Sequence, residues 1–198
     1  MIMREFKTDA RLKKITEAAA ARQDSLRVVL ENIHDPHNVS AIFRTCDAVG
    51  VKKVSLLYTI EKFPKLSKVT SASANKWIDI EKFDNTKKCI EQLKEEGFVI
   101  LSSMLDKNAV NLYDLDLTKK VALVVGNEHR GISETLHKLS DQTFYIPMKG
   151  MIQSLNVSVA SAVILYEAQR QREAKGMYDK SELKKEELEY LIDKWCDK

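Results

Sequence analysis

Glycine and proline are scarce in this chain of 198 residues, which contains six glycines and three prolines. None of the glycines stands in a GxGxxG or Walker pattern, and the first strand-like segment is followed by a loop without glycine. Dinucleotide-binding folds, P-loop enzymes and methyltransferases with a glycine-rich first turn need such glycines, so their absence argues against all three classes. The GxSxG pattern of hydrolases is absent as well.

Cysteine is also rare, with three residues placed far apart at positions 46, 89 and 196. No CxxC or Cys/His ligand spacing is present, which argues against a disulfide framework and a zinc site. The four histidines are scattered over loops, and scattered loop histidines are seldom metal ligands. No metal cofactor is expected.

Long apolar runs are missing too, since no segment reaches eighteen apolar residues. The first fourteen residues are charged rather than signal-like, so the sequence predicts a soluble cytoplasmic protein without a membrane partner. The net charge is only +3, and the first 23 residues carry an excess of this size. They are predicted to form a helix, which either packs on the core with a solvated face or lies as a basic arm along a phosphate backbone.

Strand-like and helix-like segments alternate between residues 24 and 175, which is typical of an α/β fold with a parallel sheet. The domain has a basic extension, residues 1–23, and a carboxyl-terminal helical extension, residues 176–198. The apolar stripe of that last helix needs a partner surface, either this chain's core or a second subunit. The predicted strands are Leu26–Ile33, Val51–Tyr58, Trp77–Phe83, Phe98–Met104, Val121–Val125 and Phe144–Met148. The predicted helices between them span 40–49, 85–96, 132–139 and, after the last loop, residues up to about 175.

Three polar loops follow strands of this sheet, at residues 34–38, 126–131 and 147–156. Because the carboxyl ends of parallel strands meet at one edge, the three loops predict one composite site. Ser154 and Asn156 also stand where a helix begins, so helix capping alone explains one of them.

These loops carry a resemblance to a known family. The segments are NIHDPHNVSAIFRTCDAVG (Asn32–Gly50), LVVGNEHRGIS (Leu123–Ser133) and IPMKGMIQSLNVSVASAVILYE (Ile146–Glu167). In order and spacing they resemble the three motifs of the SPOUT-superfamily RNA 2′-O-methyltransferases, and most closely the TrmH branch, which modifies tRNA guanosine. The resemblance covers roughly residues 20–170.

The resemblance implies an α/β fold with a deep trefoil knot near the carboxyl terminus and a homodimer with its active site at the subunit interface. It implies 2′-O-methylation of a tRNA ribose, the D-loop guanosine at position 18, with S-adenosylmethionine as methyl donor. A related enzyme acting on rRNA or on the tRNA wobble nucleotide, and a catalytically silent RNA-binding relative, remain alternatives. The implied cofactor-binding residues are Ser102, Ser103, Gly126, Asn127, Ile146, Met148, Ser154 and Leu155.

The resemblance also assigns roles to single residues. Arg44 matches the family's essential arginine, although a surface arginine paired with Asp47 is the simpler interpretation of the same position. Asn38 is expected to orient Arg44 or the ribose, unless it is only a turn or cap residue. Glu128 is expected to hold the neighbouring loop or a partner arginine, unless it merely pairs with Arg130 or Lys138. Ser154 and Asn156 are expected to shape the last loop near the ribose. The candidates for RNA contact are Arg11, Arg22 and His37.

Overall fold

The computed structural model describes residues 3–64 and 74–198 and contains one sheet of seven strands. The strands are β1 (Gln23–Glu31), β2 (Val51–Leu57), β3 (Asp79–Phe83), β4 (Val99–Ser103), β5 (Val110–Asn111), β6 (Val121–Val125) and β7 (Gln142–Tyr145). Their order is β3-β2-β1-β6-β4-β7-β5, and every pairing is parallel. The predicted parallel α/β fold is therefore confirmed.

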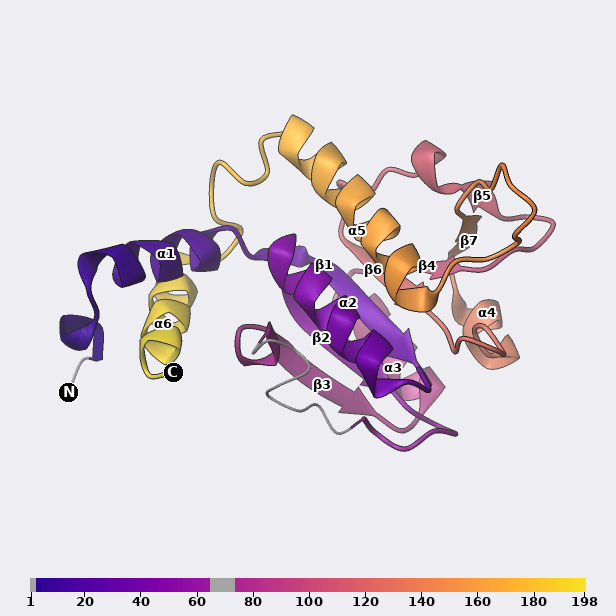
Figure 1. The fold of residues 1–198 in the computed structure, drawn as a ribbon, viewed down its shortest axis with the longest axis horizontal. Coiled ribbons are helices and arrows are strands. Elements are labelled where there is room, and N and C mark those ends of the chain that lie inside the picture. Colours follow the sequence, from indigo (N-terminus) through magenta and orange to yellow (C-terminus); the bar gives the residue numbers. More distant parts are fainter. Residues whose placement is uncertain (1–2, 65–73) are drawn as a thin grey trace.

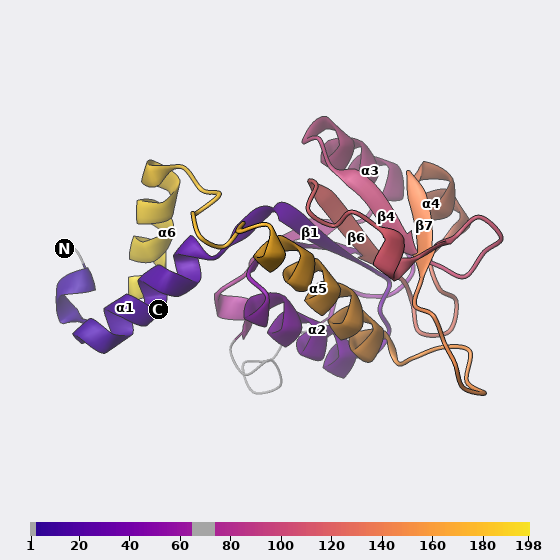
Figure 2. The same cartoon turned by 90° about the horizontal axis from the view of Figure 1, so that it is seen from above.

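Helices cover both faces of this sheet (Figure 2). The six α-helices of the described residues are α1 (Asp9–Ala20), α2 (Pro36–Ala48), α3 (Thr86–Glu95), α4 (Glu134–Leu139), α5 (Val157–Ala174) and α6 (Lys185–Cys196). One apolar cluster joins α2 and α5 to the sheet, and a second joins α3 and α4 to its other face. No helix in the described ranges is long and apolar enough to cross a membrane.

The most apolar strand lies at the centre of the sheet, as expected for a strand covered on both faces. All five residues of β6, Val121–Val125, are buried. β6 pairs with β1 on one side and β4 on the other. The sequence predicted β6 with its observed bounds.

Two strands are shorter than predicted, one at its end and one at its start. The run Phe144–Met148 was expected to be a strand, but β7 ends at Tyr145 because its partners β4 and β5 end at Ser103 and Asn111. The expected strand from Trp77 begins only at Asp79, since Trp77 closes a 3-10 turn and packs against Trp195. The two-residue strand β5 was not predicted.

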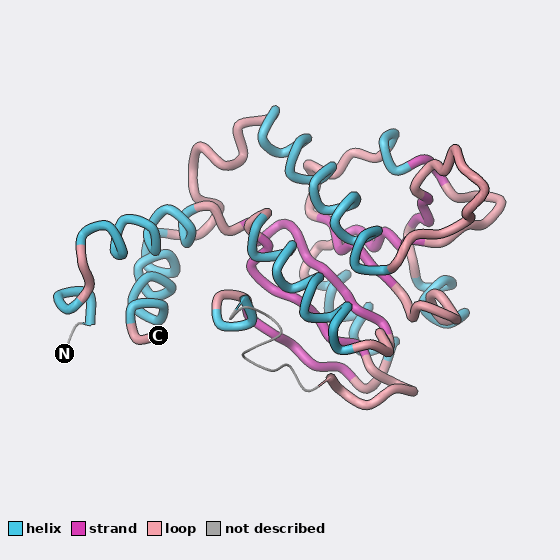
Figure 3. The backbone as a smooth tube through the Cα atoms, viewed as in Figure 1, coloured by secondary structure: helices cyan, strands magenta, loops and turns pink. Residues whose placement is uncertain are grey.

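The two terminal helices α1 and α6 pack on each other beside the sheet (Figures 1 and 3). Ile15 and Ala19 of α1 contact the apolar stripe of α6 and the segment before it. Arg4, before α1, pairs with Glu189 and Asp193 of α6 at 2.7 and 2.5 Å. The partner surface of the predicted apolar stripe of α6 is therefore α1 of the same chain. The stripe consists of Leu183, Leu188, Leu191, Ile192 and Trp195.

The side chain of Arg172, near the carboxyl end of α5, is fully buried and binds the start of β1. Its guanidinium donates to the carbonyl oxygens of Leu117, Lys119 and Ser25 at 3.0, 2.8 and 3.2 Å. It also donates to Gln23 Oε1 at 3.0 Å and to Ser25 Oγ at 2.7 Å. Burial lowers the pKa of Arg172 from its usual value, but the many acceptors around it suit a charged fork of donors.

Replacing this guanidinium should destabilise the whole domain. We expect Arg172→Met to lower the free energy of unfolding in urea by about 3–5 kcal/mol, because buried carbonyl groups lose their donor. Arg170→Met is the matched control, since Arg170 is an exposed arginine of the same helix whose one ion-pair partner among the described residues is Glu167. An Arg172→Met protein as stable as this control would contradict the assignment.

Candidate functional site

The polar loops meet at the carboxyl ends of β1 and β6, the two strands between which the chain order of the sheet reverses. Leu30 of β1 is level with Val125 of β6, so the residues that follow them lie side by side. Such a reversal leaves a crevice outside the strand ends, where α/β proteins bind their ligands. The predicted composite site therefore has its expected place.

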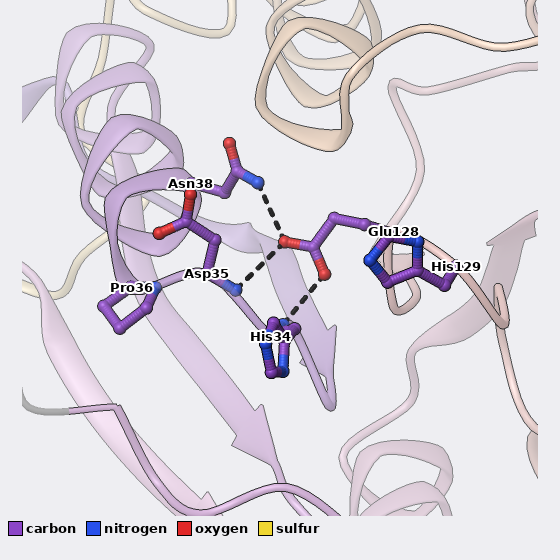
Figure 4. A pocket seen from close by; sticks show the side chains of 6 residues that line it. All are labelled: His34, Asp35, Pro36, Asn38, Glu128 and His129. Carbon is purple, nitrogen blue, oxygen red and sulfur yellow. Dashed lines mark hydrogen bonds between the residues drawn. The ribbon is translucent and has the colours of Figure 1, made fainter.

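Glu128 connects the loop after β6 to the loop after β1 (Figure 4). Its Oε1 accepts from Asn38 Nδ2 at 2.8 Å and from the backbone N of Asp35 at 3.2 Å, and its Oε2 accepts from the backbone N of His34 at 2.8 Å. Partial burial raises the pKa of Glu128, but these three donors outweigh burial and hold the pKa below its usual value. Glu128 thus contacts the neighbouring loop as an anion through three hydrogen bonds.

The simpler interpretations of Glu128 do not apply. Arg130 pairs instead with Glu61 at 2.6 Å, and Lys138 pairs with Glu134 on its own helix. Together with the first loop, Glu128 and its neighbour line a cavity of about 470 Å³. The lining residues are His34, Asp35, Pro36, Asn38, Glu128 and His129.

Asn156 extends this network to the third loop. Its Nδ2 donates to Asn38 Oδ1 at 3.1 Å, while its own Oδ1 accepts from the backbone N of Ser158 at 2.8 Å. Asn156 therefore caps α5 and contacts Asn38 at the same time. The cap of α2 is Asp35, which accepts from the backbone N of His37 at 2.8 Å, so capping does not account for Asn38. Asn38, Glu128 and Asn156 form one continuous chain of contacts.

The other two predicted catalytic residues stand outside this chain of contacts. Arg44 is exposed on α2 and forms no ion pair with another described residue. Asp47, its expected partner, binds Arg22 instead. Ser154 is exposed on the loop before α5 and lines a second, larger cavity.

The larger cavity, of about 830 Å³, lies between the loops after β4, β6 and β7. Nearly half of its lining residues belong to the segment 146–155, and Ser103, Phe144 and Ile132 are among the others. No backbone–backbone hydrogen bond joins residues 147–155 to the rest of the described chain, so their N–H and C=O groups remain available to a ligand. Five of the predicted cofactor-binding residues line it: Ser103, Ile146, Met148, Ser154 and Leu155.

The remaining three predicted cofactor residues support the cavity rather than line it. Ser102 is fully buried, and its Oγ lies 2.6 Å from Ser140 Oγ at the end of α4. Its side chain therefore contacts α4 and does not line the larger cavity, where the sequence had placed it as a cofactor-binding residue. The loop after β6 doubles back, and Asn127 and Gly131 exchange backbone hydrogen bonds of 3.0 and 2.8 Å. A Cβ on Gly126 would lie 2.3 Å from the carbonyl carbon of Gly131, so only glycine fits there.

One RNA-contact prediction is wrong, that of Arg22. Arg22 is 2% exposed, donates to the carbonyl oxygen of Val51 at 3.0 Å, pairs with Asp47 and lies over the ring of Trp195. This guanidinium is part of the protein interior and has no surface to offer to RNA. Arg11 and His37 are exposed, and Arg11 lies 5.4 Å from the Trp77 ring centre.

Two residues that shape the site, Glu61 and Asn32, are not predicted from the sequence. Glu61 accepts from Arg130 at 2.6 Å and lies 3.3 Å from His34 Nδ1. The contact with Arg130 contributes most to lowering the pKa of Glu61, and the contact with His34 lowers it further. Nothing in the local sequence marks Glu61. Asn32 turns the chain at the end of β1 with a positive φ of 51°. An asparagine directly after an apolar strand was the available signal, since asparagine tolerates this conformation better than other side chains. No group of His, Cys, Asp and Glu among the described residues could hold a metal ion.

Comparison with known proteins supplies the family. The model of the "SpoU rRNA Methylase family" matches residues 25–166. A tRNA (guanosine(18)-2′-O)-methyltransferase of Aquifex aeolicus is 44% identical over 99% of this chain and 93% of its own length. The crystal structure of the A. aeolicus TrmH/SpoU tRNA modifying enzyme superposes with a TM-score of 0.89 over 96% of both chains, at 44% identity.

A more distant solved structure contains a ligand. The AdoMet-bound rRNA methyltransferase from Sinorhizobium meliloti is 26% identical, with a TM-score of 0.67 over 78% of this chain and 59% of its own. The family match covers all three polar loops and most of the sheet, and the similarity to the Aquifex protein runs through both terminal helices. With the resemblance of the motifs confirmed, this chain belongs to the SpoU methylase family of RNA methyltransferases.

Proposed function

We propose that this protein transfers a methyl group from S-adenosylmethionine to the ribose 2′-oxygen of a tRNA guanosine, the D-loop nucleotide at position 18, and works in the cytoplasm. The observation that carries the proposal is the chain of contacts Glu128–Asn38–Asn156, which connects the three motif loops. Glu128 and Asn38 line the smaller cavity, and the loop that ends at Asn156 lines the larger one. The substrate is supported by the name of the Aquifex relative, which is similar to this chain over nearly its whole length.

The larger cavity suits S-adenosylmethionine in size and chemistry. Ile146, Met148, Leu155 and Ile132 provide apolar walls, and the segment 147–155 provides backbone donors and acceptors. A neutral adenine needs this combination, and the cofactor carries no phosphate that would require a glycine-rich cradle. When bound, it would supply an electrophilic methyl group on a positively charged sulfur. Ser103, Ile146, Met148, Ser154 and Leu155 would hold it.

Arg44 would act on the RNA side of the reaction. The ribose 2′-hydroxyl must lose its proton as the new bond forms, and a positive charge nearby stabilises the oxygen anion that develops. A guanidinium has a pKa above about 12, so it is poorly suited to serve as the base itself. We assign Arg44 the role of stabilising this oxygen and binding an RNA phosphate. Its exposure and its lack of an ion-pair partner among the described residues leave it available for both.

The network around Glu128 would position these groups. Asn38 and Arg44 share α2, whose first turn is held by Glu128 through Asp35 and Asn38. Asn156 reaches the same asparagine from the third loop, whose Ser154 lines the larger cavity. Arg11 and His37, both exposed, would contact the RNA outside the reacting nucleotide.

Methyl transfer tests the function and its leading residue together. Purified protein incubated with labelled S-adenosylmethionine and unmodified tRNA should yield 2′-O-methylguanosine in the D-loop, located by nucleoside mapping. Arg44→Ala should lower the rate by about 10³-fold or more, because it removes transition-state charge stabilisation. Cofactor affinity should not change, since Arg44 does not line the larger cavity.

Lys87→Ala, which alters an exposed basic residue of α3, is the control and should keep full activity. Near-normal turnover of Arg44→Lys would contradict the role of Arg44. Label found in rRNA or at the wobble nucleotide would reassign the substrate, and no label in any RNA would indicate a silent RNA-binding relative.

Changing the central carboxylate should loosen the site without unfolding the protein. A glutamine at position 128 has one accepting oxygen in place of two, so Glu128→Gln cannot satisfy the backbone N–H groups of His34 and Asp35 together with Asn38. We expect kcat to fall about 10- to 100-fold, because small displacements of positioned groups are costly. Glu134→Gln, which alters an exposed carboxylate of α4, is the matched control. Steady-state kinetics measure kcat, and a melting curve of each variant shows whether the protein stays folded. An unchanged kcat in Glu128→Gln would contradict the positioning role of Glu128.

The proposal includes a homodimer and a knotted chain. Met151 and Ile152 of the cavity wall are 99% and 60% exposed, and Val159 and Tyr166 lie two turns apart on α5 with about half of their surface open. A second copy covering these residues would complete the cavity, and sedimentation equilibrium should give twice the mass of one chain.

For the knot, the support is that α5 returns from β7 to pack on α2 and to hold residues 115–119 with Arg172. Stretching the chain from its ends should then stop short of the length that 198 residues reach at about 3.5 Å each. A full extension would show that the chain is unknotted.

A further inference from the structure

Asn32 has a backbone conformation found at no other non-glycine residue of the described ranges. Its φ is 51°, in the left-handed region, and its side chain is buried at 4% exposure. Side chains with a branched or bulky Cβ rarely adopt this conformation, and residues held in it tend to occur at functional sites. The turn occurs directly after β1, where the sheet gives way to the first motif loop.

The Asn32 side chain holds the segment that follows β2. Its Oδ1 accepts from three consecutive backbone N–H groups, those of Thr59, Ile60 and Glu61, at 2.9, 2.9 and 3.2 Å. Its Nδ2 donates to Thr59 Oγ1 at 3.2 Å. A single buried amide thus satisfies a stretch of backbone that has no strand beside it. The segment cannot shift without leaving these donors unpaired.

The Asn32 backbone holds the loop that follows β6. Its carbonyl oxygen accepts from Asn127 Nδ2 at 2.7 Å. Asn127 Oδ1 in turn accepts from the backbone N of His129 and of Arg130, at 3.0 and 3.1 Å. Glu128 lies between these anchored positions. The carbonyl of Asn32 therefore fixes, through one intermediate side chain, the backbone that carries Glu128.

The segment after β2 and the loop after β6, both held by Asn32, also contact each other and the loop of His34. Glu61, at the end of the segment that Asn32 holds, contacts Arg130 and His34. Arg130 belongs to the loop of Glu128, and His34 supplies one of the backbone donors to Glu128. The loops after β1, β2 and β6 are thus joined in a closed circuit. Asn32 contacts the loop after β2 through its side chain and the loop after β6 through its main-chain carbonyl, and His34 adds a second, more exposed pair of contacts to the same two loops.

We propose that Asn32 is a positioning residue for methyl transfer, which sets the place of Glu128 and thereby of Asn38 and Asn156. This inference rests on the proposed function, because it concerns the reaction at that site. The left-handed conformation is what allows the role, since it directs the carbonyl toward β6 and the side chain toward β2. Glycine could adopt this backbone and keep the carbonyl that accepts from Asn127, but it has no side chain to hold residues 59–61. Aspartate can adopt the conformation and keeps the accepting side-chain oxygen.

Three variants separate this role from a general loss of stability. Asn32→Gly keeps the backbone freedom and removes the amide. Asn32→Asp keeps an acceptor for the three N–H groups, and the Thr59 hydroxyl can turn to donate to it. Asn85→Gly removes another asparagine side chain that accepts from backbone, the cap of α3, far along the chain from the site.

The first measurement is amide hydrogen exchange, which does not depend on activity. In Asn32→Gly, the amides of residues 59–61 should exchange at least about tenfold faster than in the wild type, because they have lost their acceptor. Asn32→Asp should protect them nearly as well as the wild type. Asn85→Gly should leave them unchanged. Unaltered protection of residues 59–61 in Asn32→Gly would overturn the proposal.

The second measurement is the kinetics of methyl transfer to tRNA, at a temperature where all variants are folded. Asn32→Gly should lose about 10- to 100-fold in kcat with little change in the KM for S-adenosylmethionine, and Asn32→Asp should restore most of the rate. If Asn32 had only a structural role, the melting temperatures of Asn32→Gly and Asn85→Gly would fall alike and kcat would stay intact in both variants. That result would refute the proposed positioning role of Asn32. Should the wild type methylate no tRNA, the proposed function fails, and the exchange at residues 59–61 alone decides whether Asn32 holds the loops.

Discussion

The carboxylate of Glu128 is the contact on which the arrangement of the site depends. Three loops leave the sheet at different strands, and no backbone–backbone hydrogen bond between described residues joins one of these loops to another. The two carboxylate oxygens of Glu128 accept from two backbone N–H groups and from the Asn38 amide, and Asn38 in turn accepts from Asn156. An anion that accepts several N–H bonds stays ionised, so the contact persists over the ordinary range of pH.

The larger features of the fold could be predicted from the sequence because they depend on local patterns. The continuous apolar run Val121–Val125 predicts a strand covered on both faces, and Asn156 before a small-residue run predicts a helix start. Both predictions are confirmed. The composite site was predictable for the same reason, since loops after parallel strands share one edge. Strand ends such as that of β7 depend on the length of a neighbour, which no local pattern contains.

Individual site residues were harder to predict, because their roles depend on partners distant in the chain. Arg22 and Arg11 look alike in sequence, yet Arg22 is buried against Asp47 and Trp195 while Arg11 is exposed. Arg4 is likewise paired, with α6. Part of the basic charge of the first 23 residues therefore holds the terminal helices in place. The exposed Arg11, Lys13 and Lys14 of α1 are the basic groups that a phosphate backbone could meet.

The helix α5 is anchored at both of its ends, which limits how the larger cavity can change shape. At its start Asn156 holds Asn38, and near its end, about 25 Å away at 1.5 Å per residue, Arg172 holds β1 and the segment 115–119. A rod fixed at two distant points cannot swing as a lid. The segment 147–155 of the cavity wall makes no backbone–backbone hydrogen bond with described residues, so it can rearrange while α5 stays in place, at a small fraction of the free energy that would unfold the domain.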